Sequence, residues 1–309
     1  MAMHAASWYL SDLSLAEMLG PSHTDWEANT EPENEAMCDL CVIKSVKDKM
    51  LSRRDVFRAA AAGAGVAAAT TVAGALPAMA QTPAQILDLT HELSKDFPTF
   101  GGEPGYRAEK IFDFAKDGYN LYSLTIDEHS GTHLDAPLHF SADGQSVAEI
   151  PVDKLVTPLC IIDIKERAAD NPDAQVTPDD LKAWISANGD IPAGACVAMN
   201  SGWSAHSSSD MFRNADADGV MHFPGFHIEA VQMLMEEADV AGLAVDSLSL
   251  DHGISQDFAV HYAWLPSGRW GLECIANLDA LPPSGATLIV GAPKNRGGTG
   301  GPSRVMAMV

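Results

Sequence analysis

Basic residues are scarce in this chain of 309 residues, which holds 19 Lys and Arg against 42 Asp and Glu. The formal net charge is −23 at pH 7, and residues 82–309 alone hold 32 acidic and 13 basic side chains. A surface of this sign repels the phosphates of nucleic acids and of anionic membranes. We therefore expect neither as a partner. The charge says little about the expected small-molecule substrate, because the charge need not line the pocket.

Cysteine is also rare, and its five residues do not form the pattern of a disulfide framework. Cys38 and Cys41 form a lone C-x-x-C motif in a polar segment, without the second pair that a zinc knuckle needs. Cys160, Cys196 and Cys274 stand in apolar, strand-like contexts. We expect these three to be core residues rather than catalytic thiols.

The chain also lacks an internal repeat, a G-x-G-x-x-G motif after a strand and an apolar run suited to spanning a membrane. The stretch Ala59–Ala75 is too rich in Ala and Gly to make a good span. The glycine-rich segment Gly297–Gly301 precedes an extended end rather than a helix. It is therefore interpreted as a loop and not as a phosphate cradle.

The N-terminal region has the features of an export signal. Twin arginines, Arg53 and Arg54, precede the weakly hydrophobic stretch, and Ala78-Met79-Ala80 is a small-residue cleavage signal. This order is typical of a Tat signal. It predicts passage through the Tat export machinery to the periplasm, or a cytoplasmic protein if the signal is not cleaved.

These features divide the chain into three parts. Residues 1–49 are expected to be a polar N-terminal extension outside the mature protein, and Met50 is an alternative start. Residues 50–81 are the Tat-type signal segment. Residues 82–309 form a catalytic domain of 228 residues, with no membrane span and enough length for one proper core.

The pattern of apolar residues predicts an α/β fold. A helix is expected from Thr177, an N-cap followed by Pro178, to Asn188-Gly189, and a second from about Ile228 to Ala238. Alternation of apolar and polar residues at 121–126 predicts a half-buried strand. Strands are expected at Ile86–Leu89, Leu121–Ile126, Leu159–Ile164, Cys196–Asn200, Leu243–Asp246, Thr287–Gly291 and Arg304–Val309.

Four metal-binding or proton-transferring side chains follow the strand at 121–126: His129, His133, Asp135 and His139. In an extended chain His129 and His133 would lie roughly 13 Å apart, too far to share one ion, so the chain must turn between them. Ser130-Gly131 is suited to that turn. Beyond it, His133 and Asp135 at i and i+2 face the same side. His and carboxylate suit Zn²⁺ or Mn²⁺, and His139 is the better candidate for general acid/base.

This segment, His129-Ser-Gly-Thr-His-Leu-Asp-Ala-Pro-Leu-His-Phe140, resembles the H-x-G-T-H-x-D-x-P-x-H-F signature of the cyclase family of metal-dependent hydrolases, which includes kynurenine formamidase and isatin hydrolase. The resemblance covers about residues 85–309. It implies a swivelling β/β/α fold, assembled as a homo-oligomer, either a dimer or a tetramer. It also implies that His129, His133 and Asp135 bind metal and that His139 transfers protons.

The resemblance extends to residues distant in sequence. His261 and Glu273 have the twelve-residue spacing that completes a second metal position in formamidases, so one or two divalent ions are implied. A histidine on a helix surface is the alternative for His261. Phe100 stands where formamidases place a substrate-contacting Trp, which weakens the case for N-formylkynurenine in particular.

The expected function is hydrolysis of an amide, formamide or lactam C–N bond by metal-generated hydroxide, with His139 as general acid/base. An isatin-type cyclic amide hydrolase, an ester or lactone hydrolase, and a non-catalytic periplasmic binding protein are the alternatives. For the segment Asp246–His252, a place in the pocket and a structural polar network stay equally open. Four other histidines are expected to be structural: His91, His206, His222 and His227.

Overall fold

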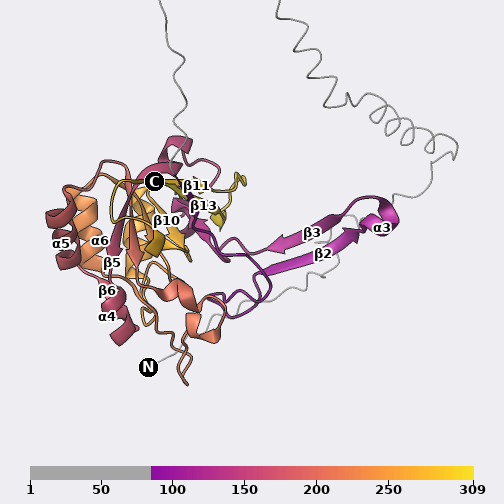
Figure 1. The fold of residues 1–309 in the computed structure, drawn as a ribbon, viewed down its shortest axis with the longest axis horizontal. Helices are drawn as coiled ribbons and strands as arrows, with labels where there is room; N and C mark the ends of the chain where they lie inside the picture. The colour runs from indigo at the N-terminus through magenta and orange to yellow at the C-terminus, as the bar shows by residue number, and fades with distance from the viewer. Residues whose placement is uncertain (1–84) are drawn as a thin grey trace, which may run out of the picture. The chain divides into compact units, whose positions relative to one another are not determined.

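The computed structural model describes residues 85–309, so the expected N-terminal extension and signal segment lie outside the described residues. Within this range the fold is built on a nine-stranded mixed sheet with the order β1-β13-β11-β5-β7-β9-β10-β4-β12. The central strands β5, β7, β9 and β10 run parallel, whereas the strands on either side of them are antiparallel. Figure 1 shows α5 and α6 beside this sheet and the hairpin of β2 and β3 apart from it. The expected α/β fold is thereby confirmed.

The strands of this sheet are β1 (Ile86–Asp88), β4 (His133–Asp135), β5 (Val156–Asp163), β7 (Ala195–Asn200), β9 (Val240–Val245), β10 (Trp270–Glu273), β11 (Ala286–Gly291), β12 (Gly300–Pro302) and β13 (Arg304–Met308). Two small two-stranded sheets pair β2 (Tyr106–Phe112) with β3 (Leu121–Ile126) and β6 (Gln175–Val176) with β8 (Gly225–Phe226). The α-helices are α3 (Phe114–Asp117), α4 (Lys165–Asp170), α5 (Pro178–Asn188), α6 (Ile228–Glu237) and α7 (Ala259–Trp264). Short 3₁₀ helices cover Pro137–Phe140, Val152–Leu155, Trp203–His206, Asp210–Phe212, Leu265–Ser267 and Leu278–Ala280.

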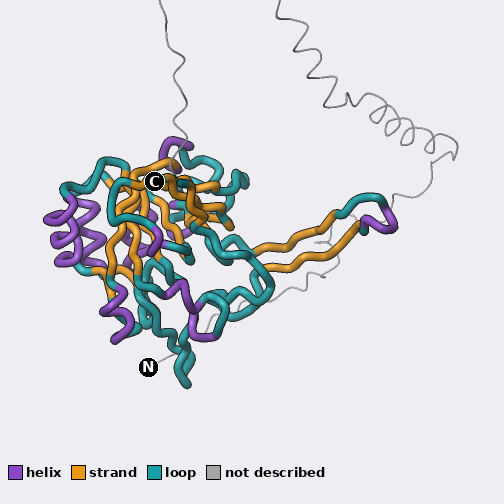
Figure 2. The backbone as a smooth tube through the Cα atoms, viewed as in Figure 1, coloured by secondary structure: helices purple, strands orange, loops and turns teal. Residues whose placement is uncertain are grey.

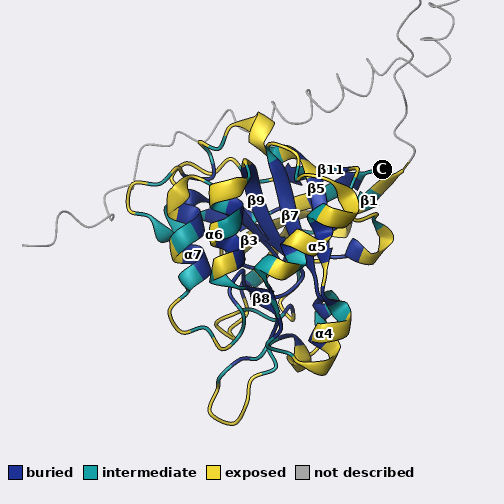
Figure 3. Ribbon diagram, turned by 90° about the vertical axis from the view of Figure 1, so that its left-hand side faces the viewer, coloured by how far each residue is buried: buried dark blue, intermediate teal, exposed yellow. Residues whose placement is uncertain are grey.

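The parallel centre of the sheet is buried on both faces, as parallel sheets require. On one face α5 and α6 pack against the strands, and Figure 3 shows both helices in front of dark, buried β5, β7 and β9. The opposite face packs with β11, β13 and the loops that follow β1 and β10. Among the described residues, no helix is long and apolar enough to cross a bilayer.

Both predicted helices are confirmed. At the start of α5 the Asp180 carboxylate accepts from the Thr177 backbone N–H at 2.7 Å, and Pro178 occupies the first turn. This capping box satisfies two donors that a helix start leaves free. The sequence signal at this helix was local, and so it predicted the helix start correctly.

The strand at 121–126 is also confirmed, but the expectation of half burial is wrong. Every residue of β3 is exposed, with Tyr122 and Leu124 each 51% accessible. β3 pairs only with β2, and the hairpin extends away from the sheet, as the tube in Figure 2 shows. The apolar side of β3 therefore has no partner within the described chain.

Candidate metal-centred active site

The expected cluster forms around the short strand β4, which lies between β10 and β12. Asp135 pairs with Gly271 on one side and with Gly300 on the other. A side chain at Gly300 would meet the Leu134 carbonyl oxygen at 2.3 Å and His129 Cε1 at 2.8 Å. Gly300 on the neighbouring strand β12 thus leaves room for the imidazole of His129 beside β4. This is a structural reason for the glycine-rich segment, whose last residues form a strand.

The predicted turn before β4 is present and orients His133. Gly131 has φ +65°, a left-handed conformation that glycine adopts without strain. The His133 Nδ1–H donates to the Gly131 carbonyl oxygen at 2.8 Å, so Nε2 faces the interior. That nitrogen lies 3.3 Å from Asp135 Oδ1 and 3.3 Å from Glu273 Oε2.

His261 joins the cluster from α7 and is buried, which excludes a helix-surface histidine. Its Nδ1 lies 2.6 Å from Asp251 Oδ2, and the Asp251 carboxylate also accepts from the backbone N–H groups of Val260 and His261. The ring is therefore held so that Nε2 lies 3.1 Å from Glu273 Oε1 and 3.6 Å from Asp135 Oδ2. Asp251 is thus a positioning residue for His261, and its role was left open by the sequence.

His129 and His139 lie on the other side of Asp135. His129 Nδ1 is 2.6 Å from Asp135 Oδ1, and its Nε2 is 2.9 Å from Thr299 Oγ1, which donates to Glu128. The rings of His129 and His139 are stacked, with centroids 3.7 Å apart. Thr299 and Glu128 gave no sequence signal, because the contact joins positions about 170 residues apart.

The ligand atoms form two groups that share Asp135. One group is His129, Asp135 and His139, and the other is His133, Asp135 and Glu273; within each, the ligand atoms lie within 4.8 Å of one another. Two atoms at the centre, His133 Nε2 and Asp135 Oδ2, are buried without a hydrogen-bond partner. Buried polar atoms are rarely left unpaired, and His with carboxylate suits a divalent cation. The residues therefore fit the implied metal.

The pKa values of His133 and His139 are shifted in opposite directions. Burial opposes charge on His133, but the carboxylates of Asp135 and Glu273 outweigh it and raise the pKa of His133 to about 10. Burial lowers the pKa of His139 to about 4, against the weaker opposing influence of Asp135. His139 is consequently neutral near pH 7 and able to accept a proton.

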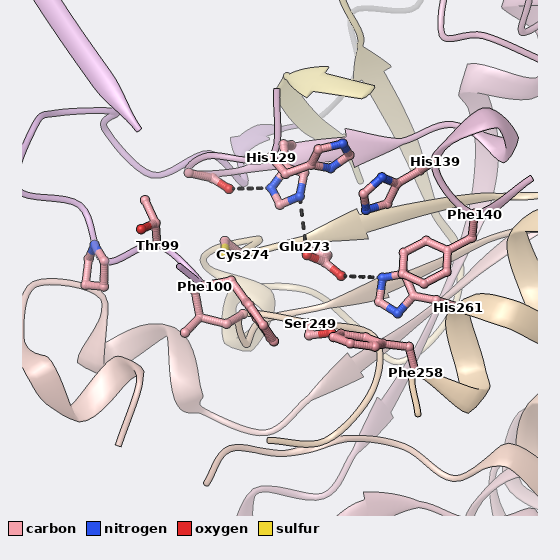
Figure 4. Close-up of a pocket in the computed structure, with 14 residues that line it drawn as sticks. Thr99, Phe100, His129, His139, Phe140, Ser249, Phe258, His261, Glu273 and Cys274 are labelled. Atoms are coloured by element: carbon pink, nitrogen blue, oxygen red, sulfur yellow. Dashed lines mark hydrogen bonds and ion pairs between the residues drawn. The ribbon is translucent and has the colours of Figure 1, made fainter. Parts of the chain in front are cut away.

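A cavity of about 280 Å³ opens onto the cluster. Aromatic rings dominate its wall, and Figure 4 shows Phe100, Phe140 and Phe258 around the space in front of His139, His261 and Glu273. Phe100 lies where the sequence predicted. Phe140 and Phe258 complete the wall, and no sequence pattern assigned a role to either of them. The residues lining the cavity are Pro98, Thr99, Phe100, His129, Gly131, His133, His139, Phe140, Leu248, Ser249, Phe258, His261, Glu273 and Cys274.

Two further predictions are settled by burial. Ser249 lines the cavity, whereas the buried Asp246 accepts from the Ser201 and Trp203 backbone N–H groups as part of a structural network. The three described cysteines are free and buried, and burial raises the pKa of Cys160 to about 12. They are core residues, as expected, although Cys274 also touches the cavity.

Comparison with known proteins agrees with this geometry. The Cyclase family model matches residues 87–252. Isatin hydrolase of Roseibium aggregatum is 32% identical over 72% of this chain and 86% of its own length. Kynurenine formamidase of Salinibacter ruber is 28% identical over 60% of this chain and 79% of its own length.

Solved structures show the same likeness. The structure of isatin hydrolase A from Labrenzia aggregata, bound to benzyl benzoate, superposes with a TM-score of 0.69 at 38% identity, over 73% of this chain and 93% of that one. The match to the family model includes the motif at 129–139 and Asp251, whereas His261 and Glu273 follow it in the chain. This chain belongs to the Cyclase family.

Proposed function

We propose that the protein is a metal-dependent hydrolase that cleaves the C–N bond of an aromatic amide, with a cyclic amide of the isatin type as the preferred substrate. The supporting observation is an apolar, aromatic-walled cavity that opens directly onto two groups of metal-binding side chains. No Lys or Arg is among the described residues that line it. A substrate with a free carboxylate, such as N-formylkynurenine, would therefore find no Lys or Arg partner in that wall.

The residues that would hold the metal are His129, His133, Asp135, His261 and Glu273. Asp135 belongs to both groups of ligand atoms, which favours two positions, and His261 Nε2 lies 3.1 Å from Glu273 Oε1 beside the second one. Zn²⁺ and Mn²⁺ both suit these donors. When bound, such an ion polarises a carbonyl group and lowers the pKa of water from about 15.7 toward 7.

His139 would move the proton. Its ring faces the cavity beside Asp135 and is neutral near pH 7, so it can accept a proton from the attacking water. It would return that proton to the leaving nitrogen once the C–N bond breaks. The phenyl rings of the wall would orient the aromatic part of the substrate and exclude bulk water from the site.

The test is hydrolysis by protein of known metal content. Isatin, N-formylkynurenine, formanilide and an aryl ester would be assayed before and after chelation and after adding back Zn²⁺ or Mn²⁺. We expect isatin to be cleaved fastest, and chelation to abolish the activity. Undiminished hydrolysis by metal-free protein would refute metal dependence. Metal-loaded protein that cleaves none of the four would indicate a binding protein instead.

We also propose that the protein is a homo-oligomer and that the hairpin β2–β3 contacts a second copy. Seven large apolar side chains on the hairpin are between 38% and 66% exposed: Ile111, Phe114, Tyr119, Leu121, Tyr122, Leu124 and Ile126. Exposed apolar patches of this kind mark interaction surfaces. Residues 106–126 carry three basic and three acidic side chains, so this arm is neutral and is not repelled by an acidic second copy.

Light scattering after size-exclusion chromatography tests this assembly. Leu124→Glu should shift the wild-type dimer or tetramer to a smaller species, whereas Thr125→Glu, exposed on the same strand, serves as the matched control. A monomeric wild-type protein would contradict the proposal.

Finally, we propose Tat export to the periplasm. The support is the sequence of residues 50–81, which lie outside the described residues. Fractionation of cells that express the full chain should find it in the periplasm. The variant with Arg53→Lys and Arg54→Lys should stay in the cytoplasm, and equal export of both proteins would count against the proposal.

A further inference from the structure

Phe258 has a backbone conformation that its side chain disfavours. Among the described residues, four that are not glycine have positive φ: Asn214, Phe258, Cys274 and Asn277. Asn adopts this region readily, but a bulky aromatic residue there is a real outlier. Phe258 has φ 49° and ψ 42°, and both it and Cys274 touch the same cavity. Strain of this kind persists where the surrounding structure enforces it, and it is concentrated at functional sites.

The surroundings of Phe258 show what enforces the conformation. The Phe258 carbonyl accepts from the Tyr262 backbone N–H at 2.9 Å in the first turn of α7. The two backbone N–H groups that precede it in that turn, at Val260 and His261, donate to the Asp251 carboxylate. The backbone is therefore fixed on the side of the metal centre, and the side chain of Phe258 is directed over the cavity.

The ring of Phe258 joins parts of the wall that come from different segments. Its centroid lies 5.8 Å from that of Phe100 and 5.7 Å from that of Phe140, within the range of favourable aromatic pairs. Phe100 and Phe140 belong to separate segments of the chain, and Phe258 contacts both (Figure 4). Without this ring the wall would be open between them.

We infer that Phe258 is a specificity-determining residue, which completes an aromatic wall and selects planar aromatic substrates over aliphatic amides. This inference rests on the proposed function for its kinetic consequences, but the predicted binding of a planar ring does not depend on catalysis. The Phe258 ring also packs edge-on against His261, with centroids 5.9 Å apart, but the hydrogen bond to Asp251 holds His261 in place. Loss of the Phe258 ring should therefore change discrimination while the metal stays bound.

The experiment compares kcat/KM for isatin and for succinimide, an aliphatic cyclic imide, in Phe258→Ala, Phe258→Leu and wild-type protein. The preference for isatin should fall about 10- to 100-fold in Phe258→Ala, the range expected for losing a buried aromatic contact. Phe258→Leu, which keeps an apolar side chain of smaller volume but loses the flat ring, should lose part of the preference for isatin. Ile254→Ala, in an exposed position of the same loop, is the control and should not change the preference.

A second measurement separates this inference from the proposed function. Calorimetry with indole, a planar ring without a hydrolysable bond, should detect binding to the metal-loaded wild type and much weaker binding to Phe258→Ala. If indole binding weakens in Phe258→Ala as expected but the wild type hydrolyses no substrate, the proposed function is refuted and the inference about Phe258 stands. Wild-type hydrolysis with unchanged preference and indole binding in both variants would overturn the inference.

The role of Phe258 can still be tested if Phe258→Ala folds poorly. Phe258→Gly relieves the strained backbone and should have a melting temperature no lower than that of Phe258→Ala. If both small variants unfold, Phe258→Leu decides: a reduced isatin preference supports the inference, and an unchanged one overturns it.

Discussion

At the scale of single residues, the cluster depends on groups that set the direction of each imidazole. The Gly131 carbonyl oxygen fixes His133, and the Asp251 carboxylate fixes His261. The motif at 129–139 could be predicted because its residues are close in sequence. Asp251 could not be assigned, because a carboxylate after an apolar strand gives no sign of the residue it will contact.

Asp251→Asn should weaken metal binding. The amide keeps the size of the carboxylate, but it can no longer hold the His261 ring and both backbone N–H groups equally well. We expect a 10- to 100-fold loss of metal affinity or activity, the usual range for residues that orient a ligand. Metal titration of Asp257→Asn, in the loop before α7, provides the control; equal affinities in the two variants would contradict the role of Asp251.

His139 and His133 should respond differently to removal. His139→Ala should keep the metal and lose about 10²- to 10⁴-fold in kcat, because it removes a proton-transfer group. His133→Ala should lose metal at the position that it shares with Asp135 and Glu273, since the buried Nε2 of His133 has no hydrogen-bond partner. Elemental analysis beside the kinetics checks both. Loss of metal from His139→Ala would instead make His139 a ligand, in keeping with its distance to His129 and Asp135.

At the scale of secondary-structure elements, the sequence predicted helices and strands correctly where the signal was local. It did not predict short strands that form by pairing with distant segments. The capping box predicted α5, and alternation predicted β3. The burial of β3 was wrong because alternation reports two chemically different faces, not what covers them. The short strands β10 and β12 gave no pattern, since three or four residues are too few for a period.

Gly300→Ala should disturb the contact between β12 and β4. The added methyl group would meet the Leu134 carbonyl oxygen at 2.3 Å, closer than any real contact, and a β-strand carbonyl cannot move aside. We expect about 1–3 kcal/mol of destabilisation, together with reduced metal content. Gly101→Ala is the control, because nothing lies within 4 Å of its added carbon. Equal melting temperatures for the two variants would refute this account.

At the scale of the whole molecule, the α/β layer around the parallel strands follows from the apolar runs and the two amphipathic helices. The order of the nine strands does not follow from these local patterns. It brings residue 135 beside residue 300, and such a pairing depends on how the entire sheet closes. The resemblance to a known family supplied this level of the fold, which the pattern of one sequence could not.

Metal removal should destabilise the whole domain. Binding to the folded state alone contributes about 2.7 kcal/mol when the free metal is at 100 times its Kd. For a domain of this size that corresponds to roughly 5–10 °C in melting temperature. Calorimetric scans with and without chelator measure the shift. His133→Ala, which loses one ligand of the second position, is the internal control and should show a smaller shift, so an equal shift in both proteins would point to a different metal site.

The place of β12 in the sheet has a consequence for biosynthesis. Every ligand lies at or before residue 273, yet the strand that closes the site around Asp135 and His129 comes at 300–302. A nascent chain therefore cannot complete the site until β12 has left the ribosome. Metal loading would then follow the synthesis of β12, and a ribosome-stalled chain ending before residue 300 would carry every ligand without forming the finished centre.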